Sequence, residues 1–77
     1  MAAIVYFEKA VEDAEQVTYR YGADEAKLEK SFVISKQSMR PDVDPERASF
    51  GVQLAFSGIL KGYRKQGRWP ERGAGYA

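Results

Sequence analysis

The sequence predicts a small α+β domain: a three-stranded antiparallel meander followed by one long carboxy-terminal helix packed on the sheet (β-β-β-α). Two observations predict this fold class. Apolar and polar residues alternate as far as Gln37, and a proline-containing turn then leads into a stretch with helical periodicity. A chain of 77 residues has room for one hydrophobic core. We therefore expect a single domain at residues 1–66 and a flexible, glycine-rich tail at residues 67–77.

Three segments are expected to form the strands. Residues 3–9 are dense in β-branched and aromatic side chains, residues 16–21 alternate cleanly, and residues 28–37 alternate again. The polar segments between them are short, and short connections favour antiparallel pairing because parallel strands need a long crossover. The side chains expected to point inward share a period of two and are Val5, Phe7, Val17, Tyr19, Tyr21, Leu28, Phe32 and Ile34.

The helix is expected from Pro45 to Gln66. Proline is favoured at the first helical position, and the Asp44 carboxylate can accept the free amides of the first turn as the N-cap. The residues that fall on one arc of this helix, expected to face the sheet, are Ala48, Val52, Phe56, Ile59, Leu60 and Tyr63.

A ridge of small residues runs along the same helix: Gly51, Ala55, Gly58 and Gly62. Each of the three glycines costs about 1 kcal/mol relative to alanine in a helix, so a close approach of another backbone must offset the penalty. Three explanations remain open. The helix lies tightly on its own sheet, it packs on a second copy of itself, or it kinks near Gly58.

The outer side of the predicted sheet offers a second candidate partner surface. If Val5 and Phe7 point inward, then Ile4 and Tyr6 point outward, as does Val33. These three side chains either form a modest apolar patch for a partner or are scattered surface residues of the kind found on most proteins.

The composition argues against an enzyme. The chain has no histidine and no cysteine, which removes the commonest general base and the commonest low-pKa nucleophile, and makes a tetrahedral zinc site improbable. The densest carboxylate groups lie in expected loops or at the helix cap, where capping explains them. We therefore expect no catalytic residues, no metal and no cofactor.

Charge is distributed unevenly along the chain. Residues 1–46 hold ten acids and six bases, a net charge of −4, whereas residues 47–77 hold six bases and one acid, a net charge of +5. Cations with interleaved aromatic rings are typical of surfaces that bind nucleic-acid phosphates and unpaired bases. The alternative explanation is a favourable interaction with the negative end of the helix dipole. The candidate contacts for nucleic acid or another anion are Lys61, Arg64, Lys65, Arg68, Trp69 and Arg72.

We expect, on balance, a non-enzymatic interaction module that forms a homodimer or binds another protein. The alternative is a nucleic-acid-binding protein that uses the basic carboxy-terminal segment. The sequence carries no targeting segment and no apolar run long enough to span a bilayer, which predicts a cytoplasmic protein that does not bind membranes.

Overall fold

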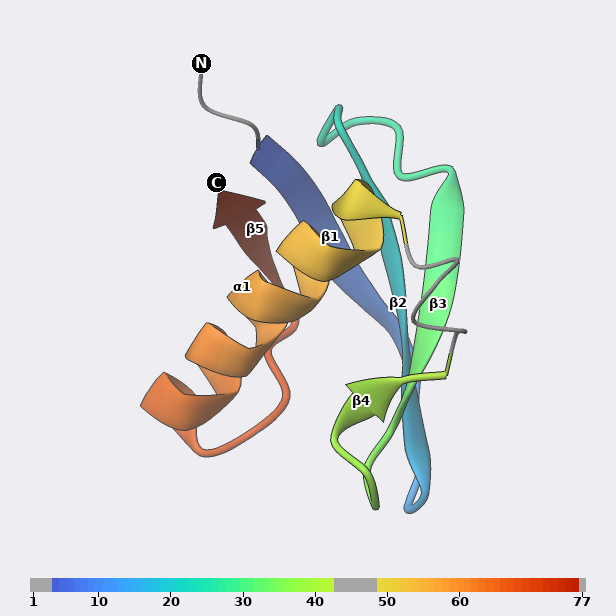
Figure 1. Cartoon of the computed structure of the whole chain (residues 1–77), viewed down its shortest axis with the longest axis vertical. Helices are drawn as coiled ribbons and strands as arrows, with labels where there is room; N and C mark the ends of the chain where they lie inside the picture. The colour runs from blue at the N-terminus through green and yellow to red at the C-terminus, as the bar shows by residue number, and fades with distance from the viewer. Residues whose placement is uncertain (1–3, 43–48, 77) are drawn as a thin grey trace.

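Five strands and one helix make up the part of the chain that the computed structural model describes, residues 4–42 and 49–76. The elements in chain order are β1 (Ile4–Glu12), β2 (Gln16–Gly22), β3 (Lys30–Ser35), β4 (Arg40–Pro41), α1 (Phe50–Gln66) and β5 (Arg72–Tyr76). The strands form one antiparallel sheet in the order β4-β3-β2-β1-β5. The sheet curls into a half-barrel, and α1 packs on one face of it, mainly against β5 and β1 (Figure 1).

The predicted β-β-β-α fold class is wrong, because the sheet has five strands and the helix is followed by another strand. Residues 72–76, expected in the flexible tail, form β5, which pairs with β1 from Ile4↔Tyr76 to Glu8↔Arg72. The two-residue β4 pairs with the end of β3. β5 contains two glycines, which have low strand propensity. Its extended conformation therefore depends on hydrogen bonds to β1 and on contact with α1, neither of which is visible in the local sequence.

The first three strands occur where the alternation predicts them. β1 extends further than expected, to Glu12, through an irregular step in the register between Lys9 and Val11. Leu28 is a correction: it precedes β3, is half-buried, and lines a groove on the other side of the sheet. The remaining side chains predicted to point inward are all buried: Val5, Phe7, Val17, Tyr19, Tyr21, Phe32 and Ile34.

The helix ends where the sequence predicts. After Gln66, Gly67 takes the left-handed conformation with φ of 73° and donates its backbone N–H to the Tyr63 carbonyl, a common helix stop. At the other end α1 begins at Phe50, and the Ser49 hydroxyl caps it by accepting the Val52 N–H at 3.2 Å. The predicted cap Asp44 and the predicted start Pro45 lie outside the described residues.

The buried face of α1 is rotated toward the small-residue ridge. Its buried side chains are Val52, Leu54, Ala55 and Ile59. Leu54 and Ala55 lie outside the predicted arc, whereas Phe56, Leu60 and Tyr63 of that arc are only partly buried, and Ala48 lies outside the described residues. The rotation follows from β5, because a fifth strand against the ridge buries helix positions that a three-stranded sheet would leave at the margin.

The segment between α1 and β5 closes the end of the core. Trp69 is 7% exposed and lies beside Tyr63, with ring centroids 4.8 Å apart. The next residue, Pro70, accepts a 2.7 Å hydrogen bond from the hydroxyl of Tyr19, whose side chain is fully buried. A hydrogen bond across 51 residues thus fixes the carboxy-terminal segment to the middle of the sheet.

Candidate functional site

The face of the sheet turned away from α1 is called here the outer face. On β1 the buried Val5 and Phe7 alternate with Ile4, Tyr6 and Glu8, which therefore point to the outer face. The antiparallel register with β5 places Tyr76 beside Ile4, Ala74 beside Tyr6 and Arg72 beside Glu8. Outward residues that are far apart in the sequence are thereby brought into adjacent positions.

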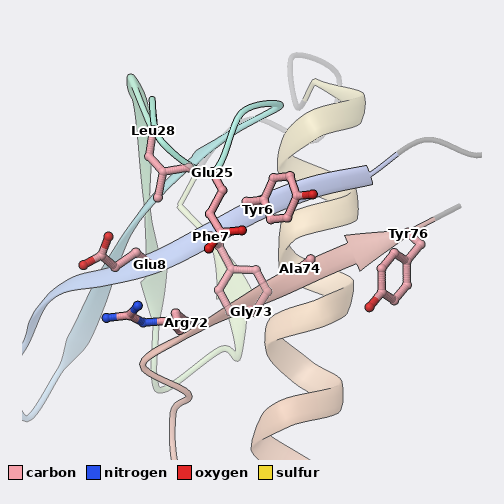
Figure 2. A pocket seen from close by; sticks show the side chains of 9 residues that line it. All are labelled: Tyr6, Phe7, Glu8, Glu25, Leu28, Arg72, Gly73, Ala74 and Tyr76. Carbon is pink, nitrogen blue, oxygen red and sulfur yellow. The ribbon is translucent and has the colours of Figure 1, made fainter.

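The outer-face patch consists of Ile4, Tyr6, Leu28, Ala74 and Tyr76. Ile4 is 39% exposed and Tyr76 is 66% exposed, so both rings and branches lie outside the core. Four of the five side chains also line a groove of about 370 Å³ between β1, β5 and the loop that precedes β3. Figure 2 shows the Tyr6 and Tyr76 rings on either side of Ala74. Phe7 and Gly73 complete the apolar lining.

Charges of both signs border this patch. The groove is also lined by Glu8 of β1, Glu25 of the loop after β2, and Arg72 of β5 (Figure 2). Glu8 lies between two bases in the register, because it is paired with Arg20 on β2 and with Arg72 on β5. The patch is therefore an apolar centre with a rim of mixed charge, which is the usual composition of a protein-binding surface.

The structure brings together two of the three outer-face residues that the sequence predicts. Ile4 and Tyr6 lie in the patch. Val33 also points to the outer face, because its partner on β2 is Thr18, but it is on the far side of the row that holds Arg20 and Glu8. Val33 therefore lies on the same face as the patch and outside it.

The small-residue ridge of α1 lies against the protein's own chain. A Cβ built on Gly58 would come within 2.7 Å of the Ala74 carbonyl oxygen of β5, and one built on Gly62 within 3.0 Å of the Pro70 ring. Gly51 faces the Tyr21 ring, and Ala55 has no exposed surface. The close approach that the three glycines require is thus supplied by β5, Pro70 and Tyr21.

The predicted anion-binding residues separate into three locations. Lys61, Arg64, Lys65 and Arg68 are exposed at the carboxy-terminal end of α1 and just beyond it. Trp69 is buried in the core, so its ring offers no free face for stacking. Arg72 lies on the outer face of the sheet, beside Glu8.

A chain of ion pairs joins the β1–β2 end of the sheet to the segment before β5. Lys9 Nζ lies 2.8 Å from a Glu12 carboxylate oxygen and 3.0 Å from one of Glu71, and Lys36 Nζ lies 2.8 Å from the other Glu12 oxygen. The hydrogen bonds from Lys36 and Lys9 lower the pKa of Glu12, and those to Glu12 and Glu71 raise the pKa of Lys9. These groups hold structural elements together.

Three members of the patch, Tyr76, Ala74 and Leu28, were missed from the sequence. The first two belong to β5, which the glycines disguised as a tail, and Leu28 was assigned to the core. One signal was present. Glycine recurs at positions 73 and 75, with Arg72, Ala74 and Tyr76 between, which is a period of two that suits a strand with one face pressed against a neighbour.

Neither a metal site nor a membrane span was found in the described part of the chain. No group of three or more acidic residues is arranged there to hold a metal ion, and its one helix lacks the length and apolarity needed to cross a bilayer. Comparison with known proteins gave no match: no protein family, no curated protein and no solved structure resembles this chain.

Proposed function

We propose that this protein is a small non-enzymatic interaction module that associates with a second copy of itself through the outer face of its sheet. The observation that carries the proposal is the outer-face patch, in which two tyrosines and Ile4 cluster outside the core. Tyrosines in a well-packed centre supply most of the binding energy of many protein interfaces. The absence of histidine and cysteine from the sequence supports a role in binding rather than catalysis.

The mixed charge of the rim supports a second copy as the partner. A two-fold symmetric dimer uses the same surface on both subunits, so that surface must be complementary to itself. Arg72 and Glu25 border one groove from opposite sides, on β5 and on the loop after β2. Two copies related by a two-fold axis through the patch can pair Arg72 of each with Glu25 of the other. A partner of a single charge sign would meet repulsion from one of these groups.

The size of a stable interface sets the extent of the contact. A standard interface covers about 800 Å² on each partner, which is about one seventh of the 5525 Å² surface of this chain. The groove alone is too small for that. The proposed contact therefore extends from the patch across the row that holds Arg20 to Val33, with the tyrosines at its centre and Val33 at its rim.

Sedimentation velocity over a concentration range tests the proposal. The protein should shift from monomer to dimer between about 1 µM and about 1 mM, the range of weak to moderate affinities. Tyr6→Ser or Tyr76→Ser should raise the dimer Kd at least tenfold. Phe50→Ser is the matched control, because Phe50 is an exposed aromatic residue (60%) on the helix and outside the patch. A chain that stays monomeric throughout, or a Phe50→Ser effect equal to that of Tyr76→Ser, would contradict the proposal.

Charge reversal tests whether the partner is a second copy in the proposed orientation. Arg72→Glu should weaken the dimer because two glutamates would then face each other. The double variant Arg72→Glu, Glu25→Arg should restore most of the affinity by reversing the pair. If the double variant dimerises no better than Arg72→Glu alone, the pairing of Arg72 with Glu25 is wrong.

A further inference from the structure

A second surface, on the opposite side of the molecule from the outer-face patch, carries charge of one sign. The cationic face consists of Lys61, Arg64 and Lys65 at the end of α1, and Arg68 immediately after it. The spacing of these residues, at intervals of three and four, places them on neighbouring turns of one helix side. All four are exposed, and residues 61–68 contain no acid.

Within the described residues, no carboxylate neutralises the cationic face. The ion pairs there join Lys9 and Lys36 to Glu12 and Glu71, and none includes a base of this face. Glu71, the nearest acid in sequence, is held by Lys9 at 3.0 Å. The helix dipole explains little of the cluster, because a helix end carries about half an elementary charge, whereas the face carries four. This excess of positive charge is available to an external anion.

The regular spacing of the charges fits a repeating polyanion. From Lys61 to Lys65 the helix rises about 6 Å, which is close to two nucleotide steps of about 3.4 Å along one strand of a duplex. Duplex DNA also has the higher charge density, with one charge for about every 1.7 Å of axis when both strands are counted. A surface that acts through charge alone therefore favours a duplex over a single strand.

The aromatic residues near the cationic face are engaged within the core. Recognition of unpaired bases uses exposed aromatic rings as stacking platforms. Trp69 is 7% exposed, and its ring lies 4.8 Å from that of Tyr63, which is itself partly buried. The combination of phosphate contacts and base stacking that the sequence suggested is thus reduced to phosphate contacts.

We infer that the cationic face of α1 binds the phosphate backbone of double-stranded DNA without reading its sequence. This inference is independent of self-association, because α1 and the outer-face patch lie on opposite sides of the sheet. A dimer joined through the outer faces would carry one cationic face on each exposed side. Loss of dimerisation therefore leaves the DNA contact of each copy intact.

Fluorescence anisotropy with a labelled DNA duplex at several salt concentrations tests the inference. Four phosphate contacts give a slope of about −3.6 in log K against log salt, so affinity should fall about 10²-fold between about 50 mM and about 200 mM salt. The double variant Lys61→Gln, Arg64→Gln should retain two contacts and lose only about tenfold over the same range. The control Lys30→Gln, Arg40→Gln removes two exposed bases elsewhere and the same net charge, and should behave as the wild type.

Each alternative result counts against the inference. No binding at low salt, or equal losses in the two double variants, would show that the cationic face is not the contact. Tighter binding of a single strand than of a duplex of equal length would show that bases are stacked. Polyglutamate that competes as well as duplex DNA at equal charge would show that the surface recognises acidic protein. The Tyr76→Ser variant should bind duplex DNA as the wild type does, which separates this inference from the proposed dimer.

Discussion

Gly58 of α1 and Ala74 of β5 meet with no side chain between them. A Cβ built on Gly58 would lie 2.7 Å from the Ala74 carbonyl oxygen and 3.0 Å from the Gly75 Cα. Both neighbours are backbone atoms of a strand that is hydrogen-bonded to β1, so they cannot move aside without disturbing the sheet. The helix thereby covers one edge strand of the half-barrel, which is a common protection against edge-to-edge aggregation.

Gly58→Ala should therefore destabilise the protein, although alanine is the better helix former. The propensity gain is about 1 kcal/mol, and forcing an extra methyl group into a packed contact costs about 1–3 kcal/mol. Because the obstructing atoms are backbone, we expect the upper part of that range and a net loss of about 1–2 kcal/mol in the free energy of unfolding. Urea denaturation followed by circular dichroism measures it.

Gly51→Ala is the matched control on the same helix. The nearest atom to a Cβ there is a carbon of the Tyr21 ring, at 3.3 Å, and a side chain can shift by a few tenths of an ångström. We expect a change within about 0.5 kcal/mol. If Gly58→Ala instead stabilised the protein by the full propensity difference, α1 would not lie against β5 in solution.

The sequence was informative wherever a segment's own pattern decided its structure. The alternation of Val17, Tyr19 and Tyr21 predicted both a strand and its buried face, and Gly67 marked the helix end. The outward direction of Ile4 and Tyr6 followed from the same period of two. These features depend on local side chains, which a sequence displays directly.

The strand β5 could not be predicted because its stability comes from other elements. Its two glycines reduce strand propensity, yet they allow α1 to approach: a Cβ on Gly75 would overlap the Leu54 carbonyl, and one on Gly73 would meet the Phe7 ring. The helix glycines did indicate that some backbone must approach closely. The sequence alone did not show which backbone, and without β5 the patch around Tyr76 was also out of reach.

The carboxy-terminal segment should be required for folding. A chain that stops after Gln66 lacks β5 and Trp69, and it uncovers Ala55 and Ile59, which have no exposed surface in the full chain. We expect this truncated chain to show no cooperative thermal transition and poor dispersion of its amide resonances. A truncated chain that melts cooperatively would instead support an independent domain at residues 1–66.

Trp69, the only tryptophan, reports directly on the docking of this segment. Since its side chain is 7% exposed, acrylamide should quench its fluorescence much less in the native protein than in urea, and its emission should shift to longer wavelength on unfolding. Trp69→Ala should lower the free energy of unfolding by about 3–5 kcal/mol, the usual cost of removing a buried aromatic side chain. A free tail would give native quenching equal to that of the unfolded chain.

Glu12 should make stability depend on pH in the acidic range. Its hydrogen bonds from Lys36 and Lys9 lower its pKa in the folded state below the ordinary value of 4.5. Its contribution is therefore present above that value and is lost as pH falls through the folded pKa. Glu12→Gln should cost about 1 kcal/mol at neutral pH, and the difference from wild type should vanish in strong acid. Glu15→Gln is the control, because Glu15 forms no ion pair within the described residues.

Tyr19 should make stability depend on pH in the alkaline range, with the opposite sign. Its hydroxyl donates to the Pro70 carbonyl at 2.7 Å, and burial raises the pKa of this phenol well above its ordinary value of 10.0. A raised pKa means that the contribution to stability is complete below about pH 10 and is lost as pH rises through the folded pKa. Tyr19→Phe leaves the Pro70 carbonyl without its donor and should cost about 1–3 kcal/mol at neutral pH.

The difference between wild type and Tyr19→Phe should then shrink above pH 10, because only the wild type must ionise or retain a buried phenol. Urea denaturation at a series of pH values from neutral to strongly alkaline measures it. Tyr21→Phe is the matched control: Tyr21 is 8% exposed, and its hydroxyl forms no hydrogen bond within the described residues, so its removal should change stability by less than about 0.5 kcal/mol. Equal losses in the two variants would mean that the Tyr19 hydroxyl does not hold the carboxy-terminal segment.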